Sequence, residues 1–275
     1  MKYPIYPCLW FDGKAAEAAA FYCSVFSNSR IISNSPMVTQ FELTGKKFMG
    51  LNGGPQFKFT QSVSMFVFCE TPKELDTLWA KLAPGGTVMM PLDKYPFAEK
   101  FGWTTDRFGL SWQLFLSGAK QEIKPCLLFV GDQFGRAEEA ITFYTSVFKD
   151  SQITDLNRYE KGQPAEGSIS HARFTLGGTG FVATESNLSH DFNFNESISF
   201  VVECETQDEI DYYWNKLTEG GQESMCGWLK DKFGVSWQIV PAVLGKLMSD
   251  PQKSQRVMQA FLKMKKFEIE KLLQA

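Results

Sequence analysis

The sequence predicts an α+β protein made of two copies of one design, each copy with two β-α-β-β-β modules, followed by a C-terminal helix. Three observations predict it. Residues 106–114, DRFGLSWQL, recur as residues 231–239, DKFGVSWQI. A Phe-Tyr pair within a helical pattern occurs at 21–22 and again at 143–144, and Cys-Glu-Thr occurs at 69–71 and again at 204–206. Matching segments in the same order are typical of an internal repeat.

Composition limits the classes of protein that the chain can belong to. Its 275 residues, 44% of them hydrophobic, can bury two ordinary domain cores. A net charge of −3 and the lack of a basic run argue against a nucleic-acid partner. No segment reaches the roughly 18 uninterrupted apolar residues of a membrane helix, and the N-terminus lacks the apolar core of a signal peptide. We therefore expect a cytoplasmic protein with no membrane partner.

The first copy begins with a strand over 4–11, which the Asp12-Gly13 turn ends. Residues 14–26 form a helix, because their apolar positions recur at intervals of three and four: Ala18, Phe21, Tyr22, Val25 and Phe26. Three short strands follow at 30–32, 38–43 and 47–51, and the Asn-Gly-Gly-Pro sequence at 52–55 ends the module.

A second module repeats this order from residue 62 onward. It has a strand at 62–69, a helix at 72–82 with Pro72 in its first turn, and a last strand ending at 110–115. The first domain thus covers 1–118, and a polar linker covers 119–124.

The second copy covers 125–242 and keeps the same order, with helices over 137–148 and around Tyr213-Trp214. Between its Gly-Gly pair and Trp228 it is shorter than the first copy, which carries an extra loop at 89–98. The tail, 243–275, contains an amphipathic helix over 255–273, expected to pack on the domains or on a partner chain.

The six cysteines favour packing over disulfides. Cys8 matches Cys126 and Cys69 matches Cys204, so each pair is one packing position used twice. No Cys-x-x-Cys occurs, and neither a zinc site nor a redox pair is supported.

Four segments resemble a known family: 9–13 (LWFDG), 51–57 (LNGGPQF), 226–238 (CGWLKDKFGVSWQ) and 256–260 (RVMQA). They are similar to the PhnB-like family, also labelled 3-demethylubiquinone 3-methyltransferase-like, of the vicinal oxygen chelate superfamily, which includes glyoxalase, bleomycin-resistance and extradiol dioxygenase proteins. The resemblance covers the chain twice. It implies tandem vicinal oxygen chelate domains, in which paired βαβββ modules form an open β-barrel-like sheet around a cleft. The methyltransferase label is not matched by a Gly-x-Gly-x-x-Gly loop.

For a catalytic member of the superfamily, the resemblance also implies one divalent metal, held by His and Glu on the inner faces of the first and last strands of the modules. The chain has two histidines, His171 in a strand pattern and His190 in a loop. The opening strands carry Cys8, Trp10, Cys126, Leu128 or Val130, and the closing strands carry Gln113 and Gln238. An amide is a poor ligand for a divalent ion. We therefore expect no metal and no cofactor.

A cleft lined by tryptophans and amides suits a planar or aromatic small molecule. The candidate ligand-binding residues are Trp10, Trp103, Trp112, Gln113, His171, Trp228, Trp237 and Gln238. Trp112 and Trp237 lie mid-strand, where they could instead fill the interior. Asp106 and Asp231 invite a catalytic-base interpretation, but an Asp before a basic residue and Phe-Gly more often caps a turn.

Three functions stay open at this stage. The first is binding of a small aromatic or apolar molecule without a metal. The alternative is a metal-dependent lyase, isomerase or dioxygenase-like enzyme with a reduced ligand set that uses His171. The third is a structural role, in which the copies form an intramolecular pseudo-dimer; single-copy relatives pair as homodimers, and a further homodimer of this chain stays open. No catalytic residue is assigned.

Overall fold

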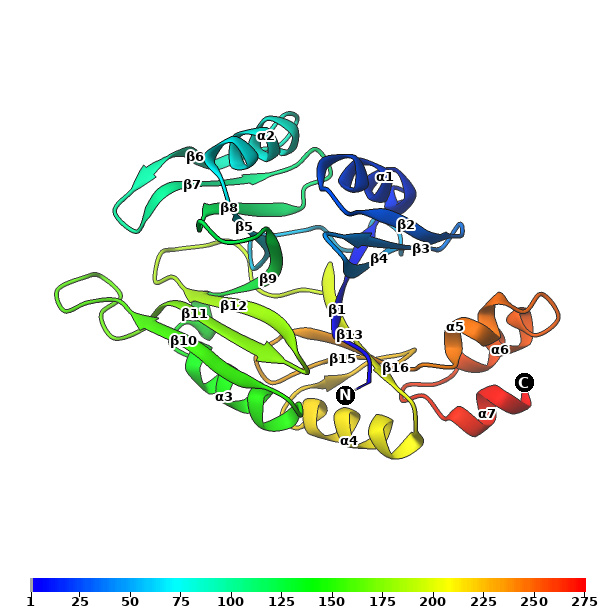
Figure 1. Cartoon of the computed structure of the whole chain (residues 1–275). Coiled ribbons are helices and arrows are strands. Elements are labelled where there is room, and N and C mark those ends of the chain that lie inside the picture. Colours follow the sequence, from blue (N-terminus) through cyan, green and yellow to red (C-terminus); the bar gives the residue numbers. More distant parts are fainter. Residues whose placement is uncertain (1) are drawn as a thin grey trace.

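The computed structural model describes residues 2–275 and has two eight-stranded sheets, which confirms the α+β class (Figure 1). The β-α-β-β-β order occurs four times. The first half contains β1 (Tyr6–Phe11), α1 (Ala15–Val25), β2 (Arg30–Asn34), β3 (Val38–Leu43), β4 (Lys46–Asn52), β5 (Val63–Cys69), α2 (Pro72–Leu82), β6 (Val88–Tyr95), β7 (Ala98–Thr105) and β8 (Ser111–Leu116).

The second half repeats the pattern with shorter strands near its end, and three short helices follow it. Its elements are β9 (Glu122–Phe129), the 3-10 turn η1 (Gly131–Gln133), α3 (Ala137–Val147), β10 (Gln152–Arg158), β11 (Ile169–Leu176), β12 (Thr179–Glu185), β13 (Ile198–Cys204), α4 (Gln207–Thr218), β14 (Gln222–Glu223), β15 (Trp228–Lys230) and β16 (Ser236–Pro241). The tail forms α5 (Leu244–Ser249), α6 (Ser254–Phe261) and α7 (Ile269–Gln274).

Each sheet takes one module from each half of the chain. Sheet A has the strand order β14-β15-β16-β13-β1-β4-β3-β2, and sheet B has the order β10-β11-β12-β9-β5-β8-β7-β6. The halves join where β1 pairs antiparallel with β13 and where β5 pairs antiparallel with β9. Neither half alone contains an eight-stranded sheet.

Two segments that looked like connections belong to sheet B. β9 begins at Glu122, so residues 122–124 of the predicted linker pair with β5. Ile123 is buried in the core while Lys124 lies on the other face, 5.0 Å above the Phe68 ring, which is the alternation of a half-buried strand. The extra loop predicted over 89–98 is instead the end of a hairpin, because β6 pairs with β7 there.

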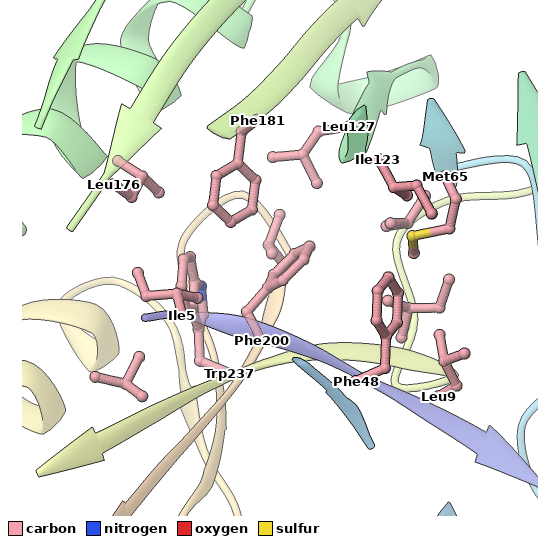
Figure 2. Close-up of a cluster of buried hydrophobic side chains, with 14 of the residues drawn as sticks. Ile5, Leu9, Phe48, Met65, Ile123, Leu127, Leu176, Phe181, Phe200 and Trp237 are labelled. Atoms are coloured by element: carbon pink, nitrogen blue, oxygen red, sulfur yellow. The ribbon is translucent and has the colours of Figure 1, made fainter. Parts of the chain in front are cut away.

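The main core lies between the two sheets (Figure 2). Ile5, Leu9 and Phe48 from sheet A meet Leu127 and Phe181 from sheet B. The four module helices pack onto the same core through their buried faces. Because side chains alternate along a strand, every second residue points to the outer face of its sheet, away from this core. We call these two surfaces outer face A and outer face B.

The repeated nonapeptide is a turn built around a buried aspartate. Asp231 Oδ1 accepts hydrogen bonds from the backbone N–H groups of Phe233 and Val235, at 2.8 and 3.1 Å. Its Oδ2 accepts from Trp237 Nε1 at 2.8 Å and from the Tyr144 hydroxyl at 2.7 Å. In the first half Asp106 accepts the corresponding bonds from Phe108, Leu110 and Trp112. The interpretation of both aspartates as turn caps is confirmed.

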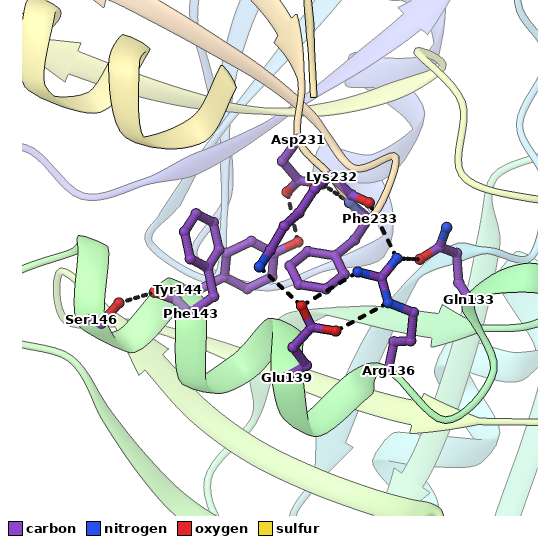
Figure 3. Close-up of polar contacts among 9 residues, drawn as sticks. All are labelled: Gln133, Arg136, Glu139, Phe143, Tyr144, Ser146, Asp231, Lys232 and Phe233. Atoms are coloured by element: carbon purple, nitrogen blue, oxygen red, sulfur yellow. Dashed lines mark hydrogen bonds and ion pairs between the residues drawn. The ribbon is translucent and has the colours of Figure 1, made fainter. Parts of the chain in front are cut away.

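The turn of sheet A also holds the helix that lies on sheet B (Figure 3). Lys232 Nζ lies 2.9 Å from Glu139 of α3. Arg136 pairs with the same carboxylate at 3.1 Å and donates to the Lys232 carbonyl at 3.3 Å. The Phe233 ring lies under the Arg136 guanidinium, at 4.6 Å. The turn therefore fastens the two sheets together.

The single helix predicted over 255–273 is wrong. It is broken into α6 and α7, because the carbonyls of Met264 and Lys265 accept hydrogen bonds from the backbone N–H groups of Cys226 and Gly227, both at 2.7 Å. A helix would use those carbonyls internally. Met264 and Phe267 are buried in the core at this point. The tail therefore packs on the second half of the chain.

The buried carboxyl should make stability depend on pH. Burial raises the pKa of Asp231 from 3.8 to about 6, although four hydrogen bonds favour the charged form. Since the folded state holds the proton more tightly, the stabilising contribution is fully present below pH about 4 and is lost as the pH rises through about 6. Relative to Asp231→Asn, wild type should lose up to about 3 kcal/mol of unfolding free energy between these limits.

Urea unfolding of wild type and Asp231→Asn across this pH range measures the difference between their unfolding free energies. The contributions of the other carboxylates are the same in both proteins and cancel in this difference. Asp12→Asn, at an exposed position, serves as the control and should follow wild type. Parallel pH profiles for wild type and Asp231→Asn would contradict the expectation.

The contact between Gly227 and the tail gives a second expectation, which concerns the stability cost of adding a side chain at Gly227. Its φ is +79°, and a Cβ there would lie 2.5 Å from the Phe267 ring and 2.6 Å from the Ile239 carbonyl oxygen. Gly13 has a φ of +69° but open space around it. Gly13→Ala should therefore cost about 1–2 kcal/mol through backbone strain alone. Gly227→Ala should cost clearly more, because the tail must also shift. Chemical denaturation checks this, and equal losses would refute the close contact.

Candidate functional site

A polar group of three side chains stands at the centre of each outer face. On outer face A, Gln238 Nε2 donates to Ser199 Oγ at 2.9 Å beside the buried Cys8 thiol. On outer face B, Gln113 and Ser64 repeat the bond at 2.8 Å beside Cys126. In each group the cysteine comes from one half of the chain, and the serine and glutamine come from the other.

These cysteines are packing residues with inert thiols. Burial raises the pKa of Cys8 and of Cys126 to about 12, despite the hydrogen bonds that neighbouring side chains offer. A thiol with so high a pKa stays protonated at neutral pH, and the thiolate is the nucleophilic form and the metal-binding form.

The residues at these positions do not fit a divalent metal. A neutral thiol, a hydroxyl and an amide offer no charged donor, whereas such ions are held by carboxylates, imidazoles or thiolates. Within residues 2–275, there is no group of three His, Cys, Asp or Glu side chains that could hold a metal ion. His171 is on β11, and its ring lies 5.8 Å from that of Phe66. Burial, followed by the nearby Arg173, lowers the His171 pKa.

A pocket of about 400 Å³ opens beside the polar group of outer face A. Three aromatic rings line it, from strand β1, strand β15 and the loop after β4. The Trp10 ring lies 5.0 Å from Phe57 and 5.9 Å from Trp228. The other lining residues are Gln56, Glu196, Gln222, Glu223, Ser224, Met225, Cys226, Leu229 and Lys230.

The Gly-Gly pair after β4 fixes the Trp10 indole. Trp10 Nε1 donates to the Gly54 carbonyl at 2.7 Å. Gly53 lies against the ring so closely that a Cβ there would be 2.2 Å from it. The indole N–H is thus used within the protein, and the segment after β4 brings Phe57 to the pocket.

The opposite wall is the β14–β15 hairpin, which the tail supports. The backbone bonds of Cys226 and Gly227 to the tail hold the hairpin turn. Glu223 accepts from Trp214 Nε1 at 3.1 Å and pairs with Lys265 of the tail at 3.3 Å. These two contacts, the indole bond first, lower the pKa of Glu223. Lys230 pairs with Glu196 at 2.8 Å.

Outer face A has a second polar cluster at its far end. The Tyr6 hydroxyl donates to Glu203 Oε1 at 2.6 Å, and Lys47 Nζ lies 2.7 Å from the same oxygen. Lys47 also lies 4.1 Å above the Tyr6 ring. The cluster does not line the pocket.

Aromatic side chains of the chain itself cover part of outer face B. The β6–β7 hairpin carries Phe101, which lies 5.9 Å from Tyr95, 5.3 Å from Phe97 and 6.3 Å from Phe66. Phe66 and Phe101 belong to a buried cluster separate from the main core. The hairpin that replaces the predicted loop thus covers part of this face.

A larger cavity, of about 580 Å³, lies between α4 and the tail. Four lysines line it, and three of them are already paired with acidic side chains: Lys265 with Glu223, Lys266 with Asp211, and Lys271 with Glu268. These pairs are solvent-exposed, so we do not assign a site there.

The predicted ligand-binding residues fall into three places. Trp10 and Trp228 line the pocket, whereas Gln238, which is paired with Trp228 across β15 and β16, is not among the lining residues. Trp103, Gln113 and His171 are on sheet B, where Trp103 Nε1 donates to Ser111 Oγ at 2.8 Å.

Trp112 and Trp237 do not reach either outer face. They are 0% and 1% exposed within the core, where their indoles donate to the turn aspartates. They therefore leave the set of site residues. The physical reason is alternation: each precedes an outward-facing glutamine, so it points inward.

Sequence reasoning missed Phe57, Glu196 and Lys230. Phe57 and Glu196 lie in irregular segments, where periodicity gives no signal. The polar residues that both halves share could have marked the outer faces, since Ser64 and Ser199 occupy matching positions five residues before the Cys-Glu-Thr segments.

No helix within residues 2–275 is long and apolar enough to cross a bilayer. None of the curated protein sequences is similar enough to count as a relative.

Several solved structures are similar to parts or all of the chain. A PhnB protein from Bacillus cereus is 41% identical over 42% of this chain and 100% of its own, with a TM-score of 0.39. Protein PA1353 from Pseudomonas aeruginosa is 25% identical over 42% and 98%, with a TM-score of 0.37. A variant of glyoxalase I from Zea mays covers 86% of this chain and 93% of its own, with a TM-score of 0.58, at 10% identity. The last likeness shows a shared fold.

The family model described as 3-demethylubiquinone-9 3-methyltransferase matches residues 3–115 and, a second time, residues 121–240. Together the two matches leave out little more than the tail. The chain therefore belongs to this PhnB-like family of glyoxalase fold, in a form that carries the family's sequence twice.

Proposed function

We propose that the protein binds one small aromatic or apolar molecule in the pocket of outer face A, without a metal ion. The observation that carries the proposal is the meeting of Trp10, Phe57 and Trp228 around a cavity of about 400 Å³. Ligand pockets are typically concave, about 300–1,000 Å³ in volume, and lined by aromatic residues with a few polar groups. This pocket has those features.

The walls come from both halves of the chain. Trp10 and Phe57 belong to the first half, and Trp228 belongs to the second. We therefore also propose that the predicted units 1–118 and 125–242 act as an intramolecular pseudo-dimer, and that the binding site depends on their association.

The alternative from the sequence, a metal-dependent enzyme that uses His171, finds less support. His171 is on sheet B and the pocket is on sheet A. Burial raises the pKa of Cys8 beside the pocket and of Cys226 in its lining, so neither thiol is an activated nucleophile at neutral pH. Binding needs only the aromatic walls and the neighbouring polar groups.

Outer face B offers a matched control for this proposal. Trp103 occupies the position of Trp228 in the other half, but the β6–β7 hairpin fills the space around it. Trp228→Ala should weaken the binding of a planar aromatic probe about tenfold or more, because it removes one wall. Trp103→Ala should leave the affinity unchanged.

Calorimetric titration of both variants with naphthol measures this, and wild type should bind one molecule per chain. Circular dichroism verifies that both variants are folded. Equal losses in the two variants, or two molecules per chain, would contradict the assignment of the site to sheet A.

A further inference from the structure

The walls and charges of the pocket also indicate the class of ligand. Resting on the proposed function, we infer that the ligand is an organic cation, an ammonium group attached to an apolar body. The pocket of outer face A combines aromatic walls with a carboxylate, and the matching positions of outer face B do not.

The three rings are arranged as a cage. The ring planes of Phe57 and Trp228 make angles of 79° and 80° with the Trp10 indole, so both stand nearly perpendicular to it. At centroid distances of 5.0 and 5.9 Å these are edge-to-face contacts, and all three residues line the same pocket. The faces of aromatic rings carry partial negative charge and attract an alkylated ammonium ion within about 6 Å.

The hydrogen-bonding groups of the cage do not favour an anion. The indole N–H of Trp10 already donates to the Gly54 carbonyl. The charged lining residues are two carboxylates, Glu196 and Glu223, and one ammonium, that of Lys230. Lys265 of the tail faces Glu223 from outside the lining, and its side chain is 60% exposed. The Glu223 side chain is itself 45% exposed, so water screens both charges of this pair and it adds little to the field in the pocket.

Glu196 is the carboxylate best placed to meet the cation. Its side chain is 26% exposed and that of Lys230 is 31% exposed, so their ion pair is half-buried at the edge of the pocket. A ligand ammonium can take the position of the Lys230 ammonium next to this carboxylate. Lys230 then swings into solvent on its flexible stem. The pair thus acts as an internal competitor for the ligand.

Sheet B has different residues at three of these positions and keeps an aromatic ring at the other two, Trp103 for Trp228 and Phe192 for Phe57. Leu128 corresponds to Trp10, Gln61 corresponds to Glu196, and Thr105 corresponds to Lys230. The complete set of three rings and the charged pair therefore occur on one face only, where Trp10, Glu196 and Lys230 are the distinguishing residues, whereas the packing residues around Cys8 and Cys126 occur on both. This difference separates ligand recognition from the needs of the fold.

The test compares choline with 3,3-dimethylbutan-1-ol, which has the same shape without the charge, by calorimetric titration of the full chain. Choline should bind about tenfold more tightly than its neutral analogue, as expected for a partly desolvated cation in an aromatic cage. Glu196→Gln should weaken choline binding about threefold to tenfold and leave the binding of the neutral analogue unchanged. Lys230→Met should strengthen choline binding, because it removes the competing ammonium.

Glu203→Gln provides the control, since Glu203 is a carboxylate of the same face outside the pocket, and it should leave choline binding unchanged. If the neutral analogue binds as tightly as choline, or if Glu203→Gln and Glu196→Gln have equal effects, the cation inference is wrong and the proposed pocket stands. If naphthol binds but choline does not, the cation inference is wrong and the proposed pocket stands, and if none of the three compounds binds, both are wrong. Circular dichroism checks the fold of each variant.

Discussion

The structure depends on two antiparallel strand pairs that join the halves of the chain, β1 with β13 and β5 with β9. Each pair completes a sheet that neither half can build alone. Each also assembles a Cys-Ser-Gln group from both halves, such as Cys8 with Ser199 and Gln238. The pocket depends on the same pairing, because Trp10 and Trp228 come from opposite halves and meet across β1, β13 and β16. Fold and candidate site therefore share one interface.

The repeated turns add a second kind of connection. Each turn joins strands of one sheet and packs on a helix of the other, as Asp231 does with Tyr144 of α3. A buried aspartate is a costly way to close a turn, since its pKa is raised by burial. Its four hydrogen bonds offset that cost and bind the turn, the tryptophan and the helix as one unit. This gives a structural reason why Asp, Phe-Gly and Trp recur together in both halves.

The sequence predicted the individual helices and strands well, but it did not predict which strands pair or which distant segments contact one another. Local periodicity and capping residues predicted the helix over 72–82 with the bounds that the structure has. Pairing between halves could not be predicted, because alternation says which residues share a face but not which strand lies alongside. Trp112 could have been placed in the core by alternation with Gln113. The break in the terminal helix could not, since it depends on bonds to Cys226 and Gly227, distant in sequence. Phe57 lies in a loop, where no period applies.

Duplication within one chain permits a difference that a symmetric dimer excludes. In a homodimer of single-copy chains, the two sheets have identical residues by symmetry. Here the residues that hold the fold, such as Cys8 and Cys126, stay the same in both halves. In contrast, Leu128 occupies the position that matches Trp10, and Gln61 occupies the position that matches Glu196. One sheet can then fill its outer face with the β6–β7 hairpin while the other keeps a pocket. Across residues 2–275, the fused chain thus retains the architecture of a pair and keeps a pocket on only one of the two outer faces, A and B.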